Sequence, residues 1–71
     1  MSYNNLKSLR RAKRMTQQEV ATACGIKRLR YQAYESGRRE PKAEMLKKFS
    51  FVLDCSVDDI LKDPNKEGSN E

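Results

Sequence analysis

The segment from residue 17 to residue 36 constrains the fold of this chain more than any other part of it. Ala21 stands four positions before Gly25, a spacing typical of two short helices that cross closely and are joined by a tight turn. Only a small side chain fits at such a crossing, and glycine tolerates the positive φ that the turn requires. Apolar residues are placed to fill the inner corner of this pair: Val20, Cys24, Ile26, Tyr31 and Tyr34.

Boundary signals place further helices around this pair and favour an all-α fold. Thr16 and Glu19 form a T-x-x-E capping box, and Ser56 and Asp59 form a similar S-x-x-D pattern. Pro41 suits the first turn of a helix, where a missing amide costs nothing. No stretch alternates in the manner of a strand. We therefore expect five helices: four near residues 4–13, 17–23, 27–35 and 42–53, and a fifth that follows the Ser56 cap and contains Val57, Ile60 and Leu61.

The length of 71 residues predicts a single small domain. We expect residues 1–62 to form that domain. Residues 63–71 begin with the helix-breaking run Asp63-Pro64-Asn65 and are expected to form a disordered acidic and polar tail. No apolar run approaches the roughly 18 residues of a membrane-spanning helix, and no apolar signal segment opens the chain. We therefore expect a cytoplasmic protein.

Positive charge is concentrated in the first two thirds of the chain. The whole sequence carries 15 Lys and Arg against 10 Asp and Glu, a formal net charge of +5. Residues 1–48 hold 13 of the basic residues and 4 of the acidic ones, whereas residues 49–71 hold 2 and 6. Such a distribution suggests a polyanionic partner for the basic part, although an ordinary solvated basic surface gives the same composition.

The residues that usually carry catalysis or bind metals are scarce. The chain has no His, which removes the commonest general base and the Cys₂His₂ zinc site. Cys24 and Cys55 are not spaced as a CxxC pair, and we interpret them as reduced, buried thiols. One disulfide in a secreted mini-protein is the alternative. We expect no enzymatic activity, no cofactor, no metal and no small-molecule ligand.

Several short segments together resemble the lambda-repressor-like helix-turn-helix family, of the Cro/C1 or XRE type. They are Leu9-Arg10, M-T-Q-Q-E-V-A at 15–21, C-G-I at 24–26, Y-E-S-G at 34–37, R-R-E-P at 38–41 and C-S-V-D-D-I-L at 55–61. The resemblance covers roughly residues 4–61. It implies a compact five-helix DNA-binding domain in which the predicted helix at 27–35 lies in the major groove of double-stranded DNA. A generic helical hairpin without a DNA-binding role is the alternative.

Helical geometry indicates which residues of that helix face outward. Tyr31 and Tyr34 define the buried direction, and the opposite face and its flanks are polar, small or basic. The candidate contact residues are Leu29, Gln32, Ala33 and Ser36 on the face, Arg28 and Arg30 beside it, and Lys27 at the helix start. Family members often carry Ser, Thr or Gln at the positions of Lys27, Leu29 and Arg30, so this version is more basic and more apolar.

These side chains suit base edges in different ways. Arg28 or Arg30 could form paired hydrogen bonds with guanine, and Gln32 could pair with adenine. Leu29 or Ala33 could touch a thymine methyl group. Plain phosphate contact is the alternative for the two arginines, and partial burial is the alternative for Leu29.

Contacts to the DNA backbone are expected at both ends of the helix pair. Gln17 matches a family glutamine beside free amides at a helix start, which suits a phosphate oxygen. Arg38, Arg39 and Lys42 follow the recognition helix and are expected to hold the phosphates beyond it. A solvated loop is the alternative for these three cations.

Glu35 falls nearer the buried side of its helix than the outward side. A carboxylate that points inward needs a cation, and Arg10 lies on the inner side of the first predicted helix. The resemblance implies that Arg10 and Glu35 form a structural salt bridge.

The small size of the domain favours a homodimer. One module of this kind buries only about 600–1,000 Å² on DNA, so high specificity usually needs two copies on a palindromic operator. Met45, Phe51 and Val52 do not fit the inner stripe of their helix cleanly and, with the last helix, are candidates for the dimer face. Packing at the edge of the core is the alternative.

The function predicted from these features is a sequence-specific transcriptional regulator, acting as a repressor that occludes a promoter. The resemblance is equally compatible with a controller protein of a restriction–modification locus, and it implies association with a bacterial or phage nucleoid. The alternative from another class is a protein-binding regulatory module, of antitoxin or anti-repressor type, that uses the same basic face. The operator, the regulated gene and any inducer are not encoded in these patterns.

Overall fold

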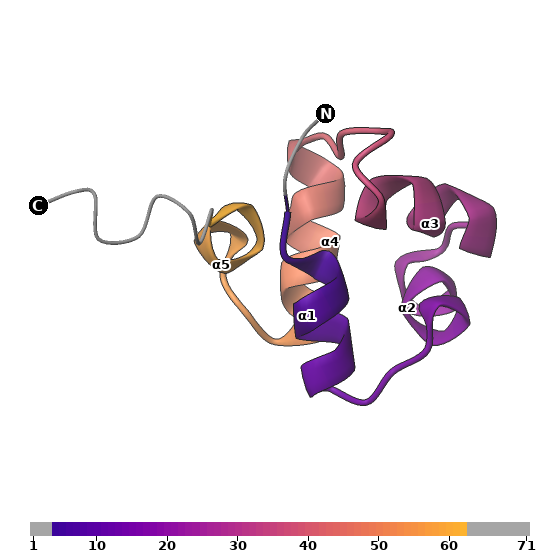
Figure 1. Ribbon diagram of the computed structural model, residues 1–71, viewed down its shortest axis with the longest axis horizontal. Coiled ribbons are helices and arrows are strands. Elements are labelled where there is room, and N and C mark those ends of the chain that lie inside the picture. Colours follow the sequence, from indigo (N-terminus) through magenta and orange to yellow (C-terminus); the bar gives the residue numbers. More distant parts are fainter. Residues whose placement is uncertain (1–3, 63–71) are drawn as a thin grey trace, which may run out of the picture.

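The structure, a computed structural model, describes residues 4–62. Figure 1 shows the described part, which is entirely helical and contains α1 (Leu6–Ala12), α2 (Gln17–Cys24), α3 (Arg28–Glu35), α4 (Ala43–Leu53) and α5 (Val57–Leu61). The predicted all-α architecture of five helices is confirmed, and α1 is shorter at both ends than predicted. The tail predicted at 63–71 lies outside the described residues.

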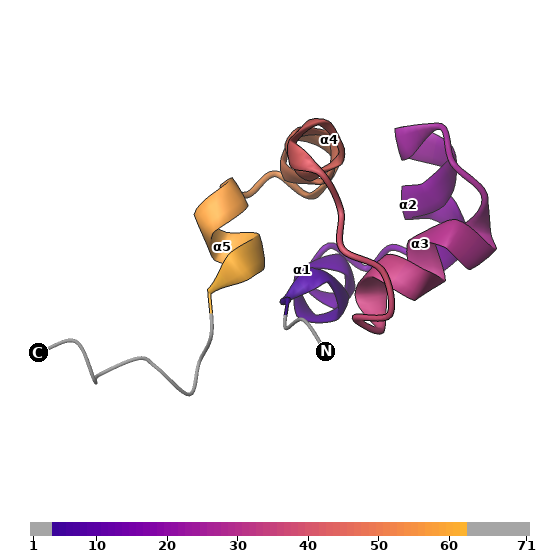
Figure 2. The same ribbon diagram turned by 90° about the horizontal axis from the view of Figure 1, so that it is seen from above.

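The α2–α3 pair lies at one end of the molecule and α5 at the other. Both views place α1 and α4 between them (Figures 1 and 2). α2 packs against both α3 and α4, α4 packs against α5, and α1 contacts α3. The helix pair is therefore held from behind by α1 and α4, and the side of α3 that faces away from them stays open.

The α2–α3 turn has the geometry that the Ala21 and Gly25 spacing predicts. Ala21 is fully buried, and Gly25 ends α2 in the left-handed region with φ +75°. The Ile26 amide donates to the Ala21 carbonyl oxygen at 3.0 Å, which closes the turn. Both halves of the Thr16 and Glu19 capping box are present, at 2.8 and 3.0 Å.

An aromatic cluster fixes the inner face of α3 against α4. The rings of Tyr31 and Tyr34 meet the Phe49 ring edge-on, with centroids 5.6 and 5.7 Å apart. All three side chains are buried. Edge-to-face pairs of this kind contribute stability beyond the area they bury, so the rotation of α3 about its own axis is set by the core. The rest of the buried core is Leu6, Val20, Ala21, Cys24, Leu53 and Ile60.

Asn5 joins the first and last described helices. Its amide donates to the Ile60 carbonyl oxygen at 2.8 Å, and its side-chain Nδ2 donates to the carbonyl oxygens of Asp59 and Lys62 at 2.8 and 2.6 Å. These bonds hold α5, which has only five residues, against the start of α1.

The residues that were candidates for a dimer face divide into two groups. Met45 and Val52 are half-buried and pack against the core, whereas Phe51 on α4 is 87% exposed. The edge-of-core alternative therefore describes the first two residues. Cys24 and Cys55 are free thiols; Cys24 is buried as expected, but Cys55 is only half-buried.

Candidate nucleic-acid interface

α3 presents an open face that carries most of the predicted contact residues. Arg28, Leu29 and Gln32 are exposed, and the Leu29 side chain remains 67% accessible to solvent. Ala33 lies at the edge of this face and is half-buried. Because Tyr31 and Tyr34 fix the opposite side in the core, the open face has one orientation relative to the rest of the molecule.

The start of α3 offers uncapped backbone amides beside a positive charge. Lys27 is exposed, occupies the N-cap position and forms no side-chain cap. The first turn of α3 contains no acidic residue. Free amides at a helix start attract anions, so this end of α3 has the polarity that a phosphate oxygen requires.

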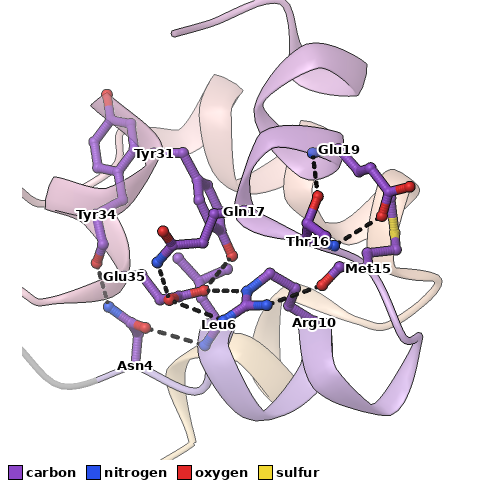
Figure 3. A network of polar contacts seen from close by, with 10 residues as sticks. All are labelled: Asn4, Leu6, Arg10, Met15, Thr16, Gln17, Glu19, Tyr31, Tyr34 and Glu35. Atoms are coloured by element: carbon purple, nitrogen blue, oxygen red, sulfur yellow. Dashed lines mark hydrogen bonds and ion pairs between the residues drawn. The ribbon is translucent and has the colours of Figure 1, made fainter. Parts of the chain in front are cut away.

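One buried carboxylate ties three helices together behind this face (Figure 3). Glu35, whose side chain is only 5% exposed, accepts from Arg10 Nε at 2.7 Å, which is the pair that the resemblance implied. It also accepts from Gln17 Nε2 at 2.7 Å and from Tyr31 Oη at 2.8 Å. Arg10 Nη1 donates in addition to the Met15 carbonyl oxygen at 2.9 Å. The network therefore fixes α1, the start of α2 and α3 relative to one another.

The charges of this network follow from its contacts. Burial alone would raise the pKa of Glu35, but the hydrogen bonds from Arg10, Gln17 and Tyr31 outweigh it and hold the pKa below its ordinary value. The bond to Glu35 raises the pKa of Arg10. Burial, and then the bond to Glu35, raises the pKa of the Tyr31 hydroxyl. At neutral pH the network consists of an ionised acid, a charged guanidinium and a protonated phenol.

Gln17 has a structural contact that its sequence position did not reveal. One hydrogen of its amide nitrogen is used by Glu35, and a primary amide has a second one. Gln17 is half-buried at the first position of α2. The residue is thus part of the scaffold, and its contact with a phosphate stays a prediction.

The Arg30 side chain lies along its own helix, against Tyr34 one turn later. Its Nε donates to Tyr34 Oη at 3.1 Å, and its guanidinium lies 5.8 Å from the centre of the Tyr34 ring. The side chain therefore lies on the flank of α3 nearest its buried stripe, and the middle of the open face is left to Leu29 and Gln32.

The loop after α3 is held by the last turn of that helix. The amides of Arg38 and Arg39 both donate to the Ala33 carbonyl oxygen, at 3.0 and 3.2 Å, and Ser36 Oγ donates to the same oxygen at 3.2 Å. Lys42 occupies the N-cap position of α4. Ser36, Arg38, Arg39 and Lys42 are all exposed, so the loop carries three cations on a fixed backbone next to α3.

Two contacts near the site were missed by the sequence reasoning. Tyr34 Oη holds Arg30 four residues earlier, a pair that the i, i+4 helical spacing could have revealed. Asn4 Nδ2 donates to the Tyr34 carbonyl oxygen at 2.8 Å, and its Oδ1 accepts from the Leu6 amide at 3.0 Å (Figure 3). This second contact joins residues 30 positions apart, and no sequence pattern indicates it.

Residues 4–62 form neither a metal-binding cluster nor a membrane-spanning helix. The described residues include no group of three or more Cys, Asp or Glu side chains placed to hold a metal ion. None of the helices in this range is long and apolar enough to cross a membrane.

Comparison with known proteins gives the family of the chain. The sequence model of the helix-turn-helix family matches residues 6–60, and the chain therefore belongs to that family. An uncharacterized HTH-type transcriptional regulator of Bacillus subtilis, YqaE, is 45% identical over 67 residues. That match covers 94% of this chain and 58% of YqaE, so the chain spans little more than half the length of this relative.

Two solved structures share the fold. The clp gene regulator ClgR from Corynebacterium glutamicum is 33% identical, with a TM-score of 0.73 over 76% of this chain and 57% of ClgR. The hypothetical transcription factor NHTF from Neisseria is 24% identical, with a TM-score of 0.80 over 94% of this chain and 77% of NHTF. The second likeness is one of fold alone.

Proposed function

We propose that this protein is a sequence-specific regulator of transcription that binds double-stranded DNA and reads the major groove with α3. The observation that carries the proposal is the open face of α3, where Arg28, Leu29 and Gln32 are exposed while the opposite face is fixed in the core. A helix of this width fits the major groove, and these three side chains match guanine, thymine and adenine edges. Family membership and the regulators among the similar proteins support the same function.

Backbone contacts complete the proposed interface. Lys27 lies at the uncapped start of α3, and Arg38, Arg39 and Lys42 follow its end. Gln17 stands at the start of α2 with one amide hydrogen left for a phosphate oxygen. Phosphate contacts fix the register of a protein on the duplex, and base contacts supply the sequence preference.

A homodimer on a palindromic operator follows from the small size of the module. Phe51 on α4 and Leu61 on α5 are exposed apolar side chains, 87% and 49% accessible, and neither lies on the open face of α3. Bound to a promoter, such a dimer acts as a repressor by blocking access to the DNA.

Selection of bound duplexes from a random pool tests the proposal. We expect enrichment of one palindromic sequence, and we expect Gln32→Ala and Leu29→Ala to relax the preference at separate positions of each half-site. Loss of one good contact costs about 1–3 kcal/mol of discrimination. Leu61→Ala is the matched control for Leu29→Ala, because α5 lies at the far end of the molecule from α3 (Figures 1 and 2). The two variants are compared on a duplex with a single half-site, where the dimer contact proposed for Leu61 does not contribute.

The outcomes separate the two candidate classes. Reading of the bases by α3 is supported if the control variant keeps the full base preference while the α3 variants lose part of it. If no duplex is enriched, the protein is not a sequence-specific regulator, and the protein-binding alternative accounts better for the basic face.

A further inference from the structure

We propose that Arg30, braced by Tyr34, holds one phosphate group in the cleft between α3 and the start of α4 and does not read a base. The inference rests on the proposed function, because the phosphate in question is one of the DNA backbone. It assigns a different role to Arg30 from that of Arg28, Leu29 and Gln32 on the same helix.

The contacts of Arg30 orient its guanidinium and leave most of its donors available. The bond to Tyr34 Oη uses Nε alone, and a guanidinium has five N–H groups. The two terminal nitrogens can therefore form the paired, charge-assisted bonds that arginine makes with phosphate. Tyr34 is 3% exposed and packs edge-on against Phe49, so the group that orients Arg30 is itself held by the core.

The cleft beside Arg30 has the size and the charge that a phosphate group needs. It measures about 210 Å³ and is lined by Arg30, Tyr34, Arg39 and Lys42. Lys48 adds a fourth cation to the wall, and Glu40 and Glu44 are its two acids. Cations thus outnumber acids, and they come from α3, from the loop and from α4. An anion in the cleft would therefore lie among cations from all three segments.

The position of Arg30 on the helix favours a phosphate over a base edge. Arg30 lies against Tyr34, on the flank of α3 that faces α4, whereas Leu29 and Gln32 occupy the open face. When a helix lies in the major groove, its outward face meets the bases and its flanks meet the two sugar–phosphate walls. Reaching a base would break the bond to Tyr34 and the stacking on its ring, whereas reaching a phosphate keeps both.

A salt series on the selected operator and on a random duplex tests this role. Each neutralised phosphate contributes about 0.9 to the slope of log affinity against log salt. We expect Arg30→Ala to reduce the slope by about 0.9 on both duplexes. The affinity for both duplexes should fall by a similar factor, about 5-fold near 0.15 M salt. The base preference in the selection should not change. Lys47→Ala, an exposed cation of α4 outside this cleft, should leave the slope unchanged.

Two conservative variants separate charge from positioning. Arg30→Lys keeps the charge and should keep most of the slope. Tyr34→Phe keeps the ring but removes the hydroxyl, and it should shift the Arg30 Nε–Hε resonance. It should lower the affinity for both duplexes by less than Arg30→Ala does. An unchanged slope in Arg30→Ala, or a changed base preference at one position, would overturn the proposal.

Titration with inorganic phosphate distinguishes a DNA phosphate from free phosphate as the anion in the cleft. Binding to random DNA tests the role of Arg30 even if the proposed sequence-specific function is wrong. If the protein selects no operator but Arg30→Ala still lowers the slope on random DNA, the phosphate role stands without sequence reading. If millimolar inorganic phosphate shifts the Arg30 Nε–Hε resonance while the DNA slope is unaffected by Arg30→Ala, the cleft takes free phosphate and the DNA assignment is wrong.

Discussion

Glu35 lies at the meeting point of α1, α2 and α3, and its charge is satisfied by partners from each of them. Arg10, Gln17 and Tyr31 all donate to this one side chain. Taking a carboxylate out of water is costly unless it is paired and hydrogen-bonded. The network therefore stabilises the fold only as a complete set, and removal of one member leaves a charge without its partner.

Removal of Glu35 should destabilise the domain strongly. We expect Glu35→Ala to lower the free energy of unfolding by about 3 kcal/mol, because it leaves the mostly buried Arg10 without its carboxylate. Lys13→Ala is the control, since it removes an ion pair with Asp54 whose side chains are 42% and 85% exposed. Exposed pairs of this kind contribute roughly 0–1 kcal/mol. Urea denaturation measures both values, and a loss below about 0.5 kcal/mol in Glu35→Ala would contradict the structural role.

The same carboxylate should make stability depend on pH in the acid range. The folded-state pKa of Glu35 lies below its ordinary value, so its contribution is present above that ordinary value, about 4.3. The contribution is lost as pH falls through the folded-state pKa. We expect the stability difference between wild type and Glu35→Gln to be constant from pH 7 to about pH 5 and to shrink steadily toward pH 2.5. A difference that does not change with pH would show that ionisation of Glu35 contributes nothing.

At the scale of single elements, the helices are defined by short local signals at their ends. Capping boxes start α2 and α5, and left-handed residues end α2 and α4, at Gly25 and Asp54. These signals act within a few residues of the chain, and for that reason the two capping boxes and Gly25 could be read directly from the sequence. The left-handed conformation of Asp54 was not predicted. The α2–α3 turn is the most important of them, because it sets the direction of α3.

A side chain at Gly25 should cost stability through backbone conformation alone. A Cβ atom at this position meets nothing within 4 Å, but the residue has φ +75°. We expect Gly25→Ala to cost about 1–2 kcal/mol, the usual penalty of a left-handed conformation. Gly25→Asn should cost clearly less, since asparagine tolerates this region. Thermal or urea unfolding compares the two, and equal losses would indicate a cause other than φ.

At the scale of the whole molecule, the two ends of the domain differ in chemistry. The open face of α3 carries Arg28, Leu29 and Gln32, whereas Leu61 lies exposed on α5 at the far end of the molecule. Phe51 lies exposed on α4, beside the end of α2. Neither Phe51 nor Leu61 lies on the open face of α3, so under the proposed function a second copy of the chain can contact these residues while α3 contacts DNA.

Assembly on DNA should therefore depend on Phe51. On a palindromic duplex we expect sedimentation to show two protein molecules per duplex for wild type, and Phe51→Ser to bind the two half-sites without cooperativity. A duplex with a single half-site is the control, and both proteins should bind it with equal affinity. A wild-type protein that stays monomeric both free and on the palindrome would exclude the homodimer.

Most of the architecture was predictable, whereas the side-chain partners near the site were not. The capping box at Thr16 and the spacing of Ala21 and Gly25 are local, and they gave the correct order of helices. The wheel of α3 placed Tyr31 and Tyr34 inside and left Leu29 outside, as the structure does. The bonds of Gln17 to Glu35 and of Asn4 to Tyr34 join residues 18 and 30 positions apart. No periodicity in the sequence relates such residues.

The sequence by itself determined the order of the helices, the capped starts of α2 and α5 and the apolar face of α3, because caps, turns and helical periodicity are properties of neighbouring residues. Tertiary structure alone decided that Arg30 lies on Tyr34 beside Arg39 and Lys42, and that Phe51 stays exposed while Val52 is partly covered. These outcomes depend on how α4 packs against α2 and α3. Packing brings together side chains that are distant along the chain, and the free energies of those contacts are set only when the helices meet.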